Sequence, residues 1–294
     1  MSEATPILVW TMGKVGTSTV SRALKRAHIP TLHMHSIRPN VHATVKWGRW
    51  LAALRKYRDS SELLGCLRRG GFQAAPSRSR PREVGLLPLL RREWNGATKA
   101  IRPPRVPHVE ASKKAVEIIA SDARPVRIIT MVREPIARNI SAFFENLHVF
   151  ALSHEAPTDQ LVKAFKARYP HRLPLEWFDR EFNDGVDFDI FAEDFDREVR
   201  VGRYRKDAFE FLVMRMDAEL ERQQAEVSDF VGQPISLAVE NSSKMKPYAA
   251  AYRAFKEQVA LEPEYIEQMY GSKFARHFWT EDELLRMAQQ HLAE

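Results

Sequence analysis

Two stretches of the chain share one order of apolar and polar positions. Residues 7–10 form a short apolar run, ILVW, typical of a strand buried on both faces. A turn with two glycines follows, and from Val20 apolar residues recur at i, i+3, i+4 and i+7, which predicts a helix with one buried face. Residues 126–132 form a second such strand, and Pro135 suits the first turn of the next helix. This repetition predicts an α/β protein in three layers, with a central parallel sheet flanked by helices.

The same patterns assign the rest of the chain. We expect a short strand at 30–35, helices at 41–59, 112–120 and 158–168, a strand at 209–216 with a helix that stops at Gly232, and helices at 248–262 and 280–291. Residues 184–196 alternate acidic and apolar side chains, which favours a half-exposed strand or turn over a cation site.

Composition changes this picture in one segment. The chain has 294 residues and a net charge of +7, a balance that suits anionic ligands. Residues 68–105 hold ten Lys and Arg against two Glu, and prolines interrupt them repeatedly. We interpret this segment as an irregular basic insertion in a single domain spanning residues 1–294. It is either a solvated loop or a wall of a groove that attracts an anionic substrate.

Other features limit the class of protein. Cys66 is the only cysteine, so an internal disulfide and a cysteine-based metal cluster are excluded. No apolar run approaches the roughly 20 residues that span a bilayer, and residues 1–6 do not begin a signal peptide. We therefore expect a cytoplasmic protein without a membrane span. The sequence does not indicate an oligomeric state.

The turn after the first strand carries the clearest candidate chemistry. Glycines let the backbone approach an anion closely, a helix start supplies free N–H donors, and Lys14 adds a full charge. The residues in question are Gly13, Lys14, Val15, Gly16, Thr17, Ser18 and Thr19. The lysine follows the first glycine, so the stretch does not match the G-x-x-x-x-G-K-[ST] pattern of a Walker A loop. The alternative interpretation is an ordinary turn between a strand and a helix.

These residues resemble the cofactor loops of sulfotransferases that use 3′-phosphoadenosine 5′-phosphosulfate (PAPS). In that superfamily a K-x-G-[TS]-[TS] core binds the 5′-phosphosulfate, and residues 14–18 are similar to it. A later strand ending in Arg, with Ser eight residues on, binds the 3′-phosphate there; Arg133 and Ser141 have this spacing. The stretch at 133–146, REPIARNISAFFEN, also resembles bacterial capsular polysaccharide synthesis proteins. The resemblance implies a P-loop-like fold, PAPS as donor and 3′,5′-ADP as product.

The resemblance also implies a general base. Some members of the superfamily use a histidine between the two cofactor loops, and His108 lies 25 residues before Arg133. Glu110, His33 and His35 are the alternatives, because relatives use a glutamate or a histidine from a neighbouring strand. Lys14 would stabilise charge on the leaving phosphate. Farther on, Arg215 and Asp217 approximate a late-strand pattern of the superfamily.

We therefore expect a sulfotransferase that moves a sulfuryl group from PAPS to a hydroxyl of a carbohydrate or glycan-like acceptor, by in-line displacement and without a metal. The acceptor can be a small molecule or a glycan and can carry negative charge; nucleic acid is not expected as a partner. Two alternatives stay open. One is a P-loop-type kinase or nucleotide hydrolase, and the other is a non-enzymatic basic module that binds polyanions through residues 68–105.

Overall fold

The computed structural model describes residues 5–38, 107–121, 125–238 and 247–292. The chain divides into two units, residues 1–42 with 107–294 and residues 43–106, and every described residue belongs to the first. The helix expected at 41–59 and the basic insertion expected at 68–105 lie outside the described residues. The single-domain interpretation stays a prediction.

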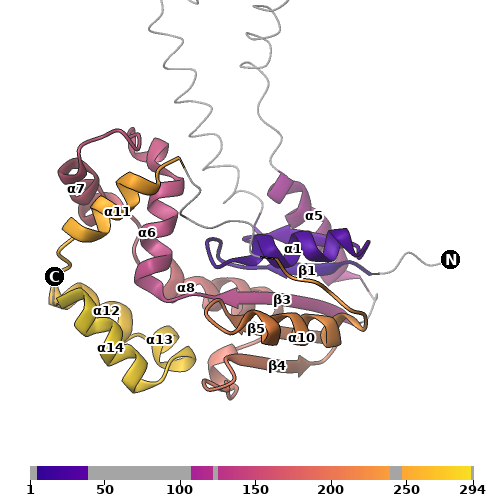
Figure 1. The fold of residues 1–294 in the computed structure, drawn as a ribbon. Helices are drawn as coiled ribbons and strands as arrows, with labels where there is room; N and C mark the ends of the chain where they lie inside the picture. The colour runs from indigo at the N-terminus through magenta and orange to yellow at the C-terminus, as the bar shows by residue number, and fades with distance from the viewer. Residues whose placement is uncertain (1–4, 39–106, 122–124, 239–246, 293–294) are drawn as a thin grey trace, which may run out of the picture. The chain divides into compact units, whose positions relative to one another are not determined.

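A five-stranded sheet in the order β2-β1-β3-β5-β4 forms the centre of the described unit (Figure 1). The strands are β1 (Ile7–Trp10), β2 (Thr31–Met34), β3 (Val126–Val132), β4 (Val201–Lys206) and β5 (Phe209–Arg215). Four strands run parallel, and β4 pairs antiparallel with β5 at one edge. All four residues of β1 are buried, as expected for a strand covered on both faces. The prediction of an α/β protein with a central parallel sheet is confirmed for four strands, and the antiparallel edge strand β4 departs from it.

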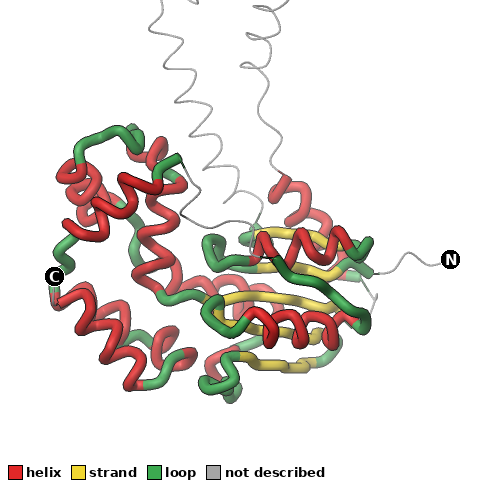
Figure 2. The backbone as a smooth tube through the Cα atoms, in the orientation of Figure 1, coloured by secondary structure: helices red, strands yellow, loops and turns green. Residues whose placement is uncertain are grey.

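Helices cover the sheet on both sides (Figures 1 and 2). The α-helices are α1 (Thr17–Arg26), α5 (Pro107–Ala120), α6 (Pro135–Glu145), α7 (Thr158–Arg168), α8 (Leu173–Phe178), α9 (Asp184–Val186), α10 (Leu220–Val231), α11 (Ala249–Gln258), α12 (Pro263–Tyr270), α13 (Lys273–Phe278) and α14 (Glu281–Leu292). Two 3₁₀ turns, Leu147–Phe150 and Ile190–Ala192, and a π-helical turn, Asp179–Asn183, complete the described elements. Helix α10 ends at Gly232, whose φ of 79° is the left-handed conformation that glycine adopts most easily.

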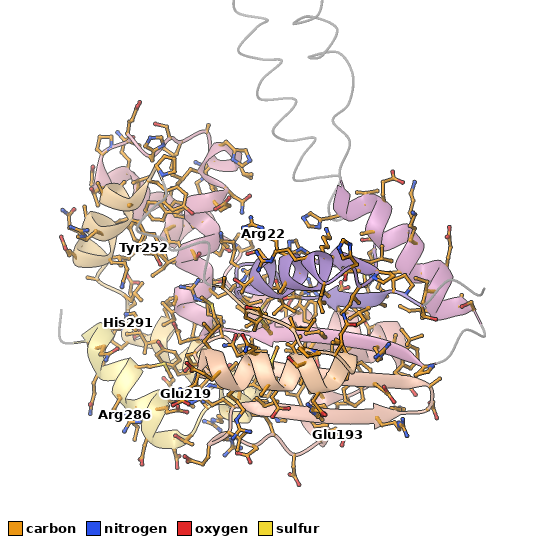
Figure 3. The ribbon with its side chains drawn as sticks, turned by 45° about the vertical axis from the view of Figure 1, so that its right-hand side comes forward. Arg22, Glu193, Glu219, Tyr252, Arg286 and His291 are labelled. Atoms are coloured by element: carbon orange, nitrogen blue, oxygen red, sulfur yellow. The ribbon has the colours of Figure 1, made fainter. Side chains whose placement is uncertain are left out.

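Aromatic packing joins the helices to one another and to the sheet. Phe143 of α6 lies 5.4 Å from Phe165 of α7 and 6.0 Å from Phe255 of α11, measured between ring centroids. Phe182 of the π-helical turn lies 5.4 Å from Phe211 of β5. Tyr252 of α11, labelled in Figure 3, contacts the ring of Phe144 at 5.1 Å. The contacts of Phe143 with Phe255 and of Phe144 with Tyr252 pack α11 against α6.

The structure corrects two expectations and decides between the two alternatives of a third. Helix α5 begins at Pro107, so His108 lies in its first turn and not in a segment before the helix. Of the strand or turn expected at 184–196, the structure has the turn: short helical turns lie at Asp184–Val186 and Ile190–Ala192, and the Asp189 side chain caps the second one. The helix expected at 248–262 ends at Gln258, and Pro263 begins a separate helix.

Candidate functional site

The anion loop, which we define as Met12–Gly16, joins the carboxyl end of β1 to α1. Gly13, Lys14 and Gly16 have φ values of 78°, 63° and 86°, so three of its five residues are left-handed. A left-handed lysine is uncommon and points to a functional constraint. No side chain caps the first turn of α1 at Gly16. Left-handed residues before an uncapped helix start are the backbone conformation found where N–H groups bind phosphate and sulfate.

Two arginines from the second stretch singled out in the sequence, which includes β3 and α6, bind the backbone of this loop. Arg138 of α6, 4% exposed, donates from Nη2 to Met12 O at 2.9 Å and from Nε to Gly13 O at 3.4 Å. Arg133, just after β3, donates from Nη1 to Lys14 O at 3.2 Å. The two stretches singled out in the sequence therefore meet in space. Burial lowers the pKa of Arg138, and the nearby Tyr169 hydroxyl, which accepts from Arg138 at 3.0 Å, opposes that shift.

The start of α6 differs from that of α1. Glu134 caps α6 with its own carboxylate, which accepts from Ile136 N at 2.6 Å and from Ala137 N at 2.7 Å. The N–H donors at this helix start are therefore already bound by a carboxylate. Any ligand phosphate on this side must be held by side chains, and Arg133 and Ser141 are both half-buried.

The predicted loop residues have different environments. Val15 is fully buried and its side chain belongs to the hydrophobic core, so it can contribute only its backbone to an anion site. Thr17 is 3% exposed, and its Oγ1 lies 3.4 Å from Nε2 of His33. Ser18 and Thr19 are half-buried in the first turn of α1.

Lys14 is paired with an acidic residue that the sequence did not single out. Its Nζ lies 3.0 Å from Oε2 of Glu145, and the two side chains are 28% and 38% exposed. The same oxygen accepts a hydrogen bond from the Tyr248 hydroxyl at 2.9 Å. Ser141 lies one helical turn before Glu145 and so shares its face of α6.

Three histidines lie beside the anion loop. The ring centroids of His35 and His108 are 4.5 Å apart, and His33 lies 5.1 Å from His35 and 5.2 Å from His108. A β-carbon placed on Gly13 would lie 3.5 Å from the His35 ring, so this ring lies against the loop. We call His33, His35 and His108 the histidine cluster. Glu110, the fourth candidate base, is exposed on α5.

Backbone carbonyls fix the tautomers of two of these histidines. His108 Nδ1 lies 2.9 Å from His33 O, and His35 Nδ1 lies 2.9 Å from Thr11 O. A carbonyl oxygen only accepts, so Nδ1 carries the proton in both rings. In the neutral form, Nε2 of each ring then carries the lone pair, as a general base requires.

A buried carboxylate binds residues next to the histidine cluster. Glu181, 5% exposed, accepts from Trp10 Nε1 at 3.2 Å, from Ser36 Oγ at 2.7 Å and from Ile37 N at 2.8 Å. It thereby joins the end of β1, before the anion loop, to the residues that follow His35. Burial raises the pKa of the Glu181 carboxyl, and these hydrogen bonds oppose that shift.

Further contacts join α5 and α8 to the same place. Ser112 Oγ lies 2.5 Å from Ser36 O and 2.7 Å from His108 O, which links the first turn of α5 to the segment after β2. Trp177 of α8 donates from Nε1 to His35 O at 2.9 Å. Within the described ranges, no three His, Cys, Asp or Glu side chains are arranged to hold a metal ion.

Comparison with known proteins identifies one similar family. The family model NKWYS, "Putative capsular polysaccharide synthesis protein", matches residues 157–280. This is less than half of the chain, and the match supports the resemblance to capsular polysaccharide synthesis proteins. It contains Trp177, Glu181 and Arg215 but none of the residues predicted from the sequence to bind the donor or act as base. No curated protein and no solved structure matches the chain.

Proposed function

We propose that this protein is a PAPS-dependent sulfotransferase of P-loop-like fold, which transfers a sulfuryl group to a hydroxyl of a carbohydrate or polysaccharide acceptor. The observation that carries the proposal is the position of the histidine cluster: it lies against a left-handed loop that holds a lysine. An anion cradle beside a group that accepts a proton is what transfer from an anionic donor to a hydroxyl requires.

The described residues fit a donor that carries two separate anionic groups. The backbone of Gly13–Thr19, with Lys14, would hold the 5′-phosphosulfate. Arg133 and Ser141 would hold the 3′-phosphate, because Glu134 already caps the start of α6. Bound PAPS supplies a sulfuryl group on a good leaving phosphate. Lys14 and the loop N–H groups are suited to stabilise negative charge that develops on that phosphate.

The acceptor hydroxyl needs a base within hydrogen-bond reach. We propose His108, with its proton held on Nδ1 by His33 O, so that Nε2 takes the hydroxyl proton. His35 has the same tautomer and lies closer to Gly13, so it is the first alternative; His33 and Glu110 follow. The family similarity favours a polysaccharide or its precursor as acceptor.

No described helix is both long and apolar enough to cross a bilayer.

Calorimetric titration with 3′,5′-ADP tests the donor site, with 5′-AMP and Mg-ATP as controls. We expect 3′,5′-ADP to bind at least tenfold more tightly than 5′-AMP, about 1.4 kcal/mol for the 3′-phosphate. Equal binding of the two nucleotides, or preference for Mg-ATP, would refute the assignment. A radiolabelled-sulfate transfer assay on neutral and acidic polysaccharides then tests the reaction.

A further inference from the structure

The pairing of Lys14 with Glu145 is unexpected in a site for an anionic donor. The Lys14 ammonium is the only full positive charge of the anion loop, and it lies 3.0 Å from a carboxylate oxygen. A phosphate group that approaches Lys14 from the loop would meet the negative charge of Glu145. The site therefore cannot use Lys14 fully while this ion pair persists.

Local helix physics does not explain why a glutamate stands here. Glu145 is the last residue of α6, and the last turn of this helix has no basic residue. The carboxyl end of a helix carries partial negative charge, which disfavours a carboxylate. The contacts that stabilise Glu145 come from other elements: Lys14 in the anion loop and Tyr248 before α11. Its position is thus explained by the site and not by the helix.

We propose that Glu145 is an internal anion that holds Lys14 until the donor's phosphosulfate replaces it. The inference rests on the proposed function, because it assigns the replacing group to that donor. On binding, Lys14 exchanges the Glu145 carboxylate for the phosphosulfate. Before binding, the ion pair with Glu145 keeps the Lys14 side chain in one position. Glu145 is a positioning residue, and because it competes with an anionic ligand for Lys14 it lowers the affinity for such ligands.

Tyr248 makes this exchange feasible. Its hydroxyl donates to the same Oε2 atom that Lys14 contacts, so the carboxylate keeps a hydrogen-bond donor when Lys14 leaves. Burial raises the pKa of Tyr248, and the neighbouring Glu145 raises it further, so the phenol stays protonated and remains a donor at neutral pH. Both partners of the ion pair are partly exposed, so separating them costs little free energy.

The test is 3′,5′-ADP affinity in Glu145→Gln. Glutamine keeps the size of the side chain and removes its charge, so we expect this variant to bind 3′,5′-ADP about tenfold more tightly than the wild type. Glu257→Gln is the matched control, because it removes an exposed carboxylate from the last turn of α11. We expect that control to stay within twofold of the wild type. A merely structural role of Glu145 predicts weaker binding or none.

A double-mutant cycle distinguishes release of Lys14 from Glu145 from direct repulsion of the ligand by the Glu145 charge. In a Lys14→Met background, Glu145→Gln should change 3′,5′-ADP affinity less than twofold, because no lysine remains to be released. An equal gain in both backgrounds, or no gain in either, overturns the proposal.

Inorganic sulfate is the second probe, and its binding is monitored through the NMR signals of the Gly13 and Gly16 amides. If no variant binds 3′,5′-ADP, the proposed function fails. Tighter sulfate binding in Glu145→Gln would then still support release of Lys14, whereas unchanged sulfate binding would overturn it.

Discussion

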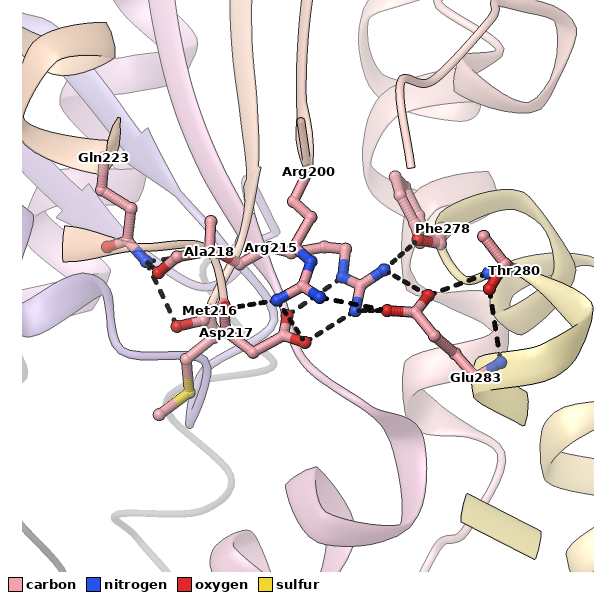
Figure 4. Close-up of polar contacts among 9 residues, drawn as sticks. All are labelled: Arg200, Arg215, Met216, Asp217, Ala218, Gln223, Phe278, Thr280 and Glu283. Atoms are coloured by element: carbon pink, nitrogen blue, oxygen red, sulfur yellow. Dashed lines mark hydrogen bonds and ion pairs between the residues drawn. The ribbon is translucent and has the colours of Figure 1, made fainter. Parts of the chain in front are cut away.

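The buried ion-pair network at the end of β5 gives the clearest prediction on stability (Figure 4). Arg215 has a side-chain exposure of 1%, and Glu283 of α14 has one of 15%. Glu283 accepts from Nη1 and Nη2 of Arg215, both at 2.7 Å, and from Thr280 N at 2.9 Å. Asp217 accepts from the same guanidinium at 2.6 Å and 3.0 Å. The network attaches the C-terminal helix to the sheet.

The perturbation is Glu283→Ala. Removing one partner of a buried ion pair costs about 3–5 kcal/mol, because the other charge stays buried. Asp217 remains bound to Arg215, so we expect the lower end, about 3 kcal/mol. Urea unfolding should show a lower midpoint at constant slope, and the melting temperature should fall by about 6–12 °C.

The control is an arginine pair at the surface. Asp229 contacts Arg203, and its side chain is 75% exposed, so Asp229→Ala should cost less than about 1 kcal/mol. If Glu283→Ala also costs less than about 1 kcal/mol, the buried network does not hold α14 to the sheet and the argument is wrong.

The pH dependence of the same pair has a defined sign. Burial would raise the pKa of Glu283, but hydrogen bonds from Arg215 and Thr280 outweigh burial and leave the pKa below its usual 4.5. A carboxyl with a lowered pKa in the folded state stabilises the protein above the unfolded-state value and stops doing so as the pH falls through the folded-state value. The stability difference between wild type and Glu283→Gln should therefore be constant near pH 7 and shrink below about pH 4.5.

Three further predictions concern the site. Arg133→Ala should weaken 3′,5′-ADP binding at least tenfold and change 5′-AMP binding less. An equal loss of affinity for the two nucleotides would show that Arg133 does not bind the 3′-phosphate. His108→Ala should abolish sulfuryl transfer and leave 3′,5′-ADP affinity within twofold, whereas surviving turnover would move the base to His35, His33 or Glu110. Glu181→Ala should cost about 3 kcal/mol in urea unfolding, because three donors lose their buried acceptor. The NMR signals of the His35 ring should shift in this variant, and unchanged signals would show that Glu181 does not position the histidine cluster.

The parallel core of the fold could be predicted because its signal is local. Strands β1 and β3 are buried along nearly their whole length, so their apolar runs stand out without knowledge of their neighbours. The stop of α10 at Gly232 is equally local. Strand β4 was not predicted because only its first two residues, Val201 and Gly202, are buried, and the other four include Arg203, Arg205 and Lys206 at the sheet edge, so it has no apolar run.

The candidate site was predictable only in part, for the same reason. The anion loop and Arg133 carry short motifs, whereas Glu145 reaches Lys14 across 131 positions and Glu181 reaches Ser36 across 145. Arg138 lies among apolar residues of α6, and nothing in its neighbours shows that its guanidinium holds Met12 and Gly13. Charged residues that pair over such separations have no local pattern, so only the folded chain identifies them.

The family similarity and the anion loop fall in different parts of the sequence, yet contacts join them. The matched residues 157–280 include Trp177, which donates to His35 O, and Glu181, which accepts from Trp10 and from the segment after His35. The matched region therefore contacts the ends of β1 and β2, which lie before the anion loop and before His35. The Glu181 variant tests whether these contacts position His35 and the anion loop, because Glu181 joins the matched region to Trp10 and Ile37.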